Sequence, residues 1–127
     1  MKLAVVGSRS FTDQEKMTEI LDIIQEEYGF DTIVSGGADG ADKLAEKYAA
    51  KRGKQVLTHP IQWGRYEDRH KIALERNKRI WDDADYGIAF WDGKSPGTRQ
   101  SLSISKQQKK LLLIYNFKTN LLERRNT

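Results

Sequence analysis

Three glycine-rich segments of the chain combine tight turns with hydroxyl, guanidinium or carboxylate side chains. They read Gly-Ser-Arg at 7–9, Gly-Gly-Ala-Asp-Gly-Ala-Asp at 36–42 and Ser-Pro-Gly-Thr-Arg at 95–99. Glycine lets a backbone approach a phosphate without a Cβ clash, and a helix that begins at such a turn offers free N–H groups and the positive end of its dipole. The sequence therefore predicts a shared site for a phosphate-bearing, nucleotide-type ligand.

The charged and hydroxyl side chains of these segments have alternative roles. Arg9 is interpreted as a clamp that holds a phosphate through two hydrogen bonds, although a surface ion pair would use the same side chain. Asp42 is interpreted as a helix cap or as an acceptor for ribose hydroxyls rather than as a general base. Asp39 could take either part or hold a metal ion, but no metal site is predicted. Ser95 and Thr98 either donate hydroxyls to phosphate or cap a helix.

Two tryptophans and a polar pair complete the candidate site. Trp91 and Trp63 could each stack on a nucleobase, and a packed position is equally compatible with either. Asn77 is expected to pin a loop backbone at the sheet edge, and its neighbour Arg76 could reach the ligand. No catalytic residue is assigned. The predicted ligand-binding residues are Gly7, Ser8, Arg9, Gly36, Gly37, Asp39, Gly40, Asp42, Arg76, Asn77, Trp91, Ser95, Gly97 and Thr98.

The elements that must position these residues alternate between strands and helices. Apolar runs predict strands at 2–7, 31–35, 54–59, 85–91 and 109–117. Helical spacing predicts helices at 12–28, 41–52, 65–82 and 97–107. Thr12 and Glu15 suggest a capping box at the start of the first helix. We therefore expect a single Rossmann-like α/β domain, with a mainly parallel sheet of about five strands and helices on both faces.

In such a sheet, ligands bind beyond the carboxyl ends of the strands, where the three glycine-rich segments fall. The domain is expected to span residues 1–117, followed by a basic C-terminal tail at 118–127. These last ten residues could form a short strand or a helix. Residues 1–98 carry 15 Lys and Arg against 17 Asp and Glu, whereas residues 99–127 carry seven against one. This basic segment is either a solvated surface or an anion-binding one.

The composition excludes several classes of protein. The 127 residues include no cysteine, which rules out disulfides, cysteine-ligated zinc and a cysteine nucleophile. No apolar run is long enough for a signal peptide or a membrane span, so a cytoplasmic protein without membrane contact is expected. Neither GxGxxG nor GxxxxGK[ST] occurs, which disfavours hydride transfer and nucleoside triphosphate hydrolysis.

Four motifs together resemble the SLOG superfamily. They are VVGSRSFTD (5–13), VSGGADGAD (34–42), ERNKRI (75–80) and FWDGKSPGTR (90–99). Over roughly residues 2–116 the chain is similar to the small, stand-alone branch related to YspA and YpsA, found in bacteria and phages. The resemblance implies a Rossmann-like fold that binds nucleotide-derived molecules, such as ADP-ribose or a cyclic nucleotide signal, in a pocket made by these loops.

The run after the third glycine segment bears on catalysis. The LOG phosphoribohydrolases of the wider superfamily carry PGGxGTxxE, whose glutamate assists cleavage of the N-glycosidic bond, whereas the run here is SPGTRQSLS. Cleavage of this bond requires a carboxylate or an equivalent group. The leading hypothesis is therefore a protein that senses or sequesters a nucleotide-derived molecule, with no required cofactor and with enzymatic activity not expected.

Two alternatives remain open. The first is a LOG-type nucleotide N-glycosidase in which Asp39, Asp42 or Asp92 replaces the missing glutamate. The second is single-stranded nucleic-acid binding like that of the DprA relatives, favoured by the basic C-terminal segment and the aromatic side chains. The weight of the motifs is on a small-molecule partner, so nucleic acid is not expected as a partner, and homo-oligomer formation is left open.

Overall fold

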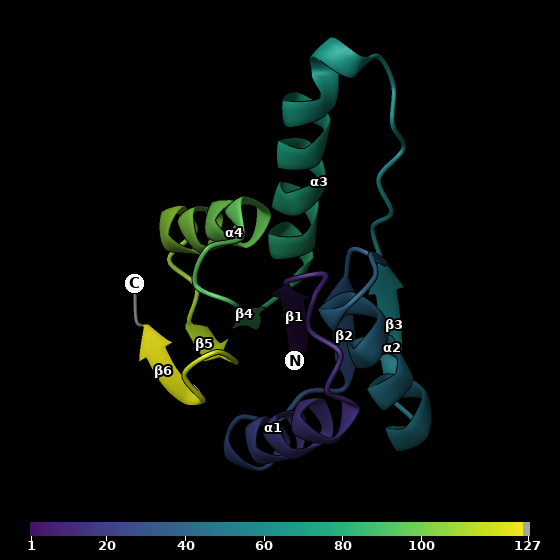
Figure 1. The fold of residues 1–127 in the computed structure, drawn as a ribbon. Helices are drawn as coiled ribbons and strands as arrows, with labels where there is room; N and C mark the ends of the chain where they lie inside the picture. The colour runs from purple at the N-terminus through teal and green to yellow at the C-terminus, as the bar shows by residue number, and fades with distance from the viewer. Residues whose placement is uncertain (126–127) are drawn as a thin grey trace.

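The sheet holds six strands in the spatial order β3-β2-β1-β4-β5-β6 (Figure 1). This computed structural model describes residues 1–125 of the chain. Neighbouring strands run parallel from β3 to β5, and β6 pairs antiparallel with β5. The strands are β1 (Lys2–Gly7), β2 (Thr32–Ser35), β3 (Gln55–Thr58), β4 (Tyr86–Trp91), β5 (Leu112–Asn116) and β6 (Leu121–Arg125). The expected Rossmann-like α/β fold with a mainly parallel sheet is confirmed.

The sixth strand is one more than the sequence predicts. A turn after β5 folds the chain back along that strand, because the Asn116 side chain accepts hydrogen bonds from the N–H groups of Lys118 (2.9 Å) and Thr119 (3.3 Å). Asn120 adopts a left-handed conformation with φ of 57°, which asparagine tolerates in turns. Of the two conformations considered for the last ten residues, the strand forms over Leu121–Arg125, and residues 126–127 lie outside the described part.

Helices cover both faces of the sheet. They are α1 (Gln14–Glu27), α2 (Ala41–Arg52), α3 (Arg69–Asp83) and α4 (Pro96–Gln107). Successive side chains of a strand point to opposite faces, so Leu3 and Val5 of β1 pack in the cluster that α1 and α2 cover. Ala4 and Val6 pack in the other cluster, with side chains of α3 and α4. Both faces of β1 are therefore buried, which explains its unbroken apolar sequence.

The start of α1 differs from the prediction. Asp13, rather than Thr12, is the N-cap, and its carboxylate accepts a hydrogen bond of 3.0 Å from the N–H of Lys16. The predicted capping box of Thr12 and Glu15 is wrong, because the carboxylate one residue later satisfies the free N–H group of the first turn.

The N-terminal part of α3 stands away from the sheet. The chain leaves β3, runs outward, turns through the short 3-10 helix η1 (Tyr66–Asp68) and returns along α3 (Figure 1). We call residues 60–72 the α3 arm. Two aromatic side chains of the arm are exposed, Trp63 by 49% and Tyr66 by 80%. Within residues 1–125, no helix has both the length and the apolar character needed to span a bilayer.

Candidate ligand-binding site

A pocket of about 450 Å³ opens at the carboxyl end of β1, beside the loops that lead into α1, α2 and α4. The strand order places β1 next to β4, and the chain leaves these two strands for helices on opposite faces of the sheet. Such a switch point leaves a crevice in which open α/β sheets bind ligands. Nine of the predicted residues line it: Gly7, Ser8, Arg9, Asp42, Arg76, Asn77, Ser95, Gly97 and Thr98.

The other five predicted residues do not line the pocket. Four of them, Gly36, Gly37, Asp39 and Gly40, belong to the loop between β2 and α2, and Trp91 ends β4. The Nε1–H of Trp91 donates to the carbonyl oxygen of Ser95 (3.1 Å), so this ring braces the turn that precedes α4. The structure therefore brings together the residues of the first and third glycine segments, but only part of the second.

The N–H groups of the β2–α2 loop are used inside the protein. The N–H of Gly37 donates to the Ser35 hydroxyl (3.0 Å), and that of Ala38 donates to Asp42 Oδ2 (3.1 Å). Gly40 has φ of 80°, and a Cβ there would lie 2.5 Å from the backbone of Arg9. This glycine thus permits close packing between two loops. The loop presents a carboxylate to the pocket rather than a row of free N–H groups.

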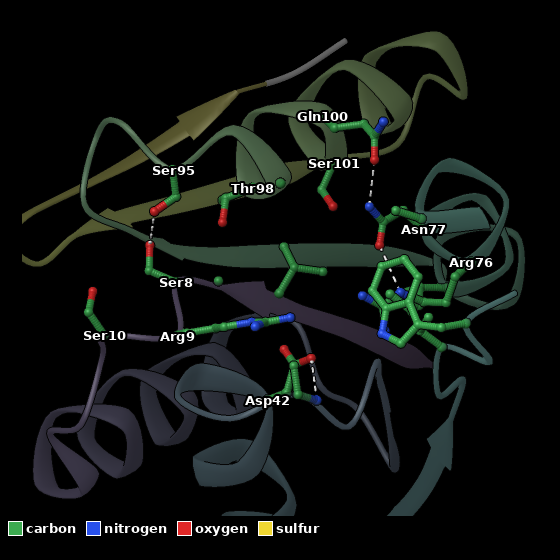
Figure 2. A pocket seen from close by; sticks show the side chains of 18 residues that line it. Ser8, Arg9, Ser10, Asp42, Arg76, Asn77, Ser95, Thr98, Gln100 and Ser101 are labelled. Atoms are coloured by element: carbon green, nitrogen blue, oxygen red, sulfur yellow. Dashed lines mark hydrogen bonds between the residues drawn. The ribbon is translucent and has the colours of Figure 1, made fainter. Parts of the chain in front are cut away.

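The start of α4, unlike the β2–α2 loop, has N–H groups that no group within the described chain accepts. Ser95 is the N-cap without a side-chain capping bond, and Pro96 occupies the first turn. Among the hydrogen bonds of residues 1–125, none uses the N–H of Gly97 or Thr98. The hydroxyls of Thr98 and Ser101 face the same space from α4 (Figure 2). Two free N–H groups and two hydroxyls at the positive end of a helix dipole form an anion-binding arrangement.

Asp92 holds the turn before α4 in shape. Its carboxylate accepts hydrogen bonds from the N–H groups of Ser95 and Lys94, each 2.8 Å, and from the Ser95 hydroxyl (2.8 Å). The N–H groups of Ser95 and then Lys94 lower the pKa of Asp92 to about 2. The Ser95 hydroxyl also lies 3.1 Å from that of Ser8. Because Ser95 gives its proton to Asp92, the Ser8 hydroxyl is the donor between the two serines.

Asp42 is the pocket's buried carboxyl group, with 7% of the residue exposed. Burial raises its pKa to about 6, against the opposing effects of the Ala38 N–H and the Arg76 guanidinium, while Glu46 adds to the rise. Of the three carboxylates considered in place of the missing glutamate, Asp42 lines the pocket and Asp39 and Asp92 do not.

Two guanidinium groups line the pocket with this carboxylate. Arg76 is half buried, and burial and the charge of Arg9 lower its pKa, against the opposing effect of Asp42. Arg9 extends across the pocket toward Asp42 (Figure 2), and it forms no ion pair within the described chain. Two positive groups against one carboxylate leave the pocket with an excess of positive charge, which favours an anionic ligand.

Arg76, rather than Asn77, holds the loop backbone. Arg76 pins loop backbone, because its Nη1 donates to the carbonyl oxygens of Gly36 (3.0 Å) and His59 (3.3 Å). Asn77 instead accepts from Arg76 Nε (2.9 Å) and donates to Gln100 Oε1 (2.7 Å). The prediction that Asn77 holds a loop backbone is wrong, since the longer guanidinium reaches the loop and the amide joins α3 to α4.

Several lining residues were not among those predicted. The helical spacing indicates Ser101, because it follows Thr98 by three residues and so lies on the same face of α4. Others depend on the path of the α3 arm, which the sequence does not specify. The additional lining residues are Val6, Ser10, Ala38, Ile61, Ala73, Ile80, Gln100 and Ser101, together with Trp63, which the sequence offers as a base-stacking ring. In the described chain, no group of three or more His, Asp and Glu side chains is arranged to hold a metal ion.

The sheet order and the pocket at its switch point define a Rossmann-like α/β domain with a crevice at the carboxyl ends of its strands. A sequence profile described as "YAcAr: YspA, cpYpsA-related SLOG family" matches residues 1–66, just over half of the chain. The chain belongs to this family. A comparison with curated proteins finds no match.

Two solved structures share the fold. DNA processing protein A from Helicobacter pylori, in a structure described as giving insight into its single-stranded DNA binding mode, is 21% identical with a TM-score of 0.66 and covers 90% of this chain. DNA processing protein A (DprA) from Streptococcus pneumoniae is 17% identical with a TM-score of 0.70 and covers 89% of this chain. The matches span 64% and 49% of those two chains.

These neighbours correct one expectation. The motifs favour a small-molecule partner and not nucleic acid, and this expectation is contradicted, because a protein of this fold is described by its single-stranded DNA binding mode. The physical reason for the error is that a crevice suited to one phosphate also suits a phosphate of a strand, so motifs for phosphate do not exclude nucleic acid.

Proposed function

We propose that the pocket binds a nucleotide-derived small molecule, such as ADP-ribose or a cyclic nucleotide, and that the protein thereby senses or sequesters it. The observation that carries the proposal is the group of free donors at the start of α4. Gly97 and Thr98, whose N–H groups have no partner among residues 1–125, line the same pocket as Arg9, which forms no ion pair there. A phosphate there accepts from a helix terminus and from a guanidinium at once.

Isothermal titration calorimetry with ADP-ribose, ADP and a set of cyclic nucleotides tests the proposal. At least one of these ligands should bind saturably and raise the melting temperature. Arg9→Gln should weaken its binding about tenfold or more, because charge-assisted hydrogen bonds contribute about 1.5–3 kcal/mol. The matched control is Lys43→Gln, which removes the same charge from an exposed side chain outside the pocket. Absence of binding across the set would overturn the proposal.

A second function, single-stranded nucleic-acid binding, is favoured by the α3 arm. The guanidinium carbon of Arg69 lies 4.9 Å from the centre of the Trp63 ring and 5.3 Å from that of Tyr66. Both rings are exposed, and Trp63 also lines the pocket. Exposed aromatic rings beside a cation are the groups on which unpaired bases stack.

Fluorescence anisotropy with labelled oligothymidylates of increasing length tests this second function. Affinity should rise with strand length and fall steeply with salt, because binding releases counterions from the strand. Trp63→Ala should weaken binding, whereas Ile23→Ala, which shortens an exposed apolar side chain outside the pocket, should not. Binding that does not depend on salt or on Trp63 would count against this function.

A further inference from the structure

A buried carboxylate in an anion-binding pocket needs an explanation. Asp42 is 7% exposed, accepts a hydrogen bond at Oδ2 from the N–H of Ala38 with a further contribution from the backbone of Gly36, and directs its carboxylate into the pocket toward Arg9 (Figure 2). The charged groups that act on it are Arg76 on α3 and Glu46 on α2. A phosphate placed against this carboxylate would be repelled, so Asp42 must face a part of the ligand that donates hydrogen bonds.

The two sides of the pocket differ in charge, and this difference determines how a ligand is oriented. Ser95, Thr98 and Ser101 lie on one side of the pocket and Asp42 lies on the other, with Arg9 between them (Figure 2). A ligand that fits must carry its anionic group at the α4 side and a hydrogen-bond donor at the Asp42 side. In a nucleotide, the donors next to the phosphate are the hydroxyls of the ribose. Base amino groups differ from one base to another, whereas these hydroxyls are common to all ribonucleotides.

We propose that Asp42 is a specificity-determining residue that accepts hydrogen bonds from ribose hydroxyls, so that the pocket selects ribonucleotide-derived ligands over their 2′-deoxy forms. This inference rests on the proposed function. It also gives the two candidate functions different requirements. DNA lacks the 2′-hydroxyl, so a DNA strand that binds this protein gains nothing from Asp42, whereas the exposed rings of the α3 arm remain available to its bases.

Calorimetry with matched ligands at pH 7.5 tests the inference. The probes are ADP-ribose and ADP, their 2′-deoxy forms, and pyrophosphate, which has no sugar. The wild-type protein should bind each ribose form about tenfold or more tightly than its 2′-deoxy form, because a hydrogen bond to a charged group contributes about 1.5–3 kcal/mol. In Asp42→Asn this ratio should fall, while affinity for pyrophosphate should stay the same or rise because a repelling charge is gone.

The control is Asp39→Asn, which makes the same change at an exposed carboxylate of the same loop, outside the pocket. It should keep the wild-type ratio. Equal binding of ribose and 2′-deoxy forms by the wild-type protein overturns the inference and leaves the proposed function intact. Failure of every probe, pyrophosphate included, overturns the inference, and it overturns the proposed function as well if the cyclic nucleotides also fail to bind. Because the wild-type ratio is informative alone, the test does not depend on whether Asp42→Asn folds.

Discussion

The raised pKa of Asp42 predicts how the unfolding free energy of the protein depends on pH. Burial raises its pKa from the ordinary 3.8 to about 6, so the folded protein holds this proton more tightly than the unfolded chain does. The resulting stability is fully present below pH 3.8 and is lost as the pH rises through 6. One pKa unit corresponds to about 1.4 kcal/mol, so the ionised carboxylate costs about 3 kcal/mol of unfolding free energy at pH 8.

Asp42→Asn removes this cost because an amide carries no charge at either pH. The unfolding free energy of the variant minus that of the wild type should therefore be about 2–3 kcal/mol larger at pH 8 than at pH 4, so the variant gains stability as the pH rises. Comparing the two pH values cancels effects of the amide that do not depend on protonation, such as an altered hydrogen bond with the Ala38 N–H.

Urea denaturation followed by circular dichroism at pH 4, 6 and 8 measures this difference for the wild type, Asp42→Asn and Asp39→Asn. The unfolding free energy gained relative to the wild type should increase between pH 4 and pH 8 for Asp42→Asn but not for Asp39→Asn. If the two substitutions changed stability by the same amount at every pH, Asp42 would not be a carboxyl group with a raised pKa, and the electrostatic account of the pocket would fail.

Three further outcomes are expected. Gly40→Ala should destabilise the protein by about 2 kcal/mol or more, because a Cβ would meet the Arg9 backbone at a positive φ, whereas Gly53→Ala, with positive φ but open space, should cost about 1 kcal/mol in the same urea assay. The hydrogen bonds that lower the pKa of Asp92 stabilise the fold above pH 3.8 and are lost as the pH falls toward 2, so the stability lost in Asp92→Asn should shrink over that range. ADP-ribose or AMP recovered by chromatography after long incubation should be intact, and free base that appears with wild type but not with Asp42→Asn would show hydrolysis instead.

The sequence predicts the framework of the site well, because strand ends and turns are local features. Gly7 and Trp91 end buried strands as the apolar runs indicate, and the parallel order brings their loops to one edge. The partners of individual N–H groups could not be predicted, since they depend on how loops approach in three dimensions. Ala41 N–H donates to the carbonyl oxygen of Ser8 across two loops (3.3 Å). Nothing local to 36–42 shows that its N–H groups are occupied in this way.

The same reasoning applies to side chains whose contacts the sequence does not determine. Trp91 looks like a base-stacking ring because it borders a glycine turn, but the carbonyl oxygen of Ser95 lies within reach of its indole N–H. Arg76 and Asn77 are neighbours on α3, and the structure decides which reaches the loop through side-chain length and the distance to Gly36. The sequence places a polar pair at this edge of the sheet, but which of the two side chains contacts the loop depends on tertiary structure.

The placement of the carboxylate bears on the difference between holding and cutting a nucleotide. The resemblance to the LOG enzymes places their glutamate three residues after the threonine, and in this chain that position is Ser101. Ser101 is buried and faces the pocket from α4, whereas the carboxylate of the pocket belongs to Asp42 on the opposite side (Figure 2). A carboxylate on α4 would stand among the free N–H groups that attract the phosphate, but one on α2 stands apart from them. This geometry leaves the α4 end of the pocket without a negative charge, and it supports the proposal that a ligand is held there intact.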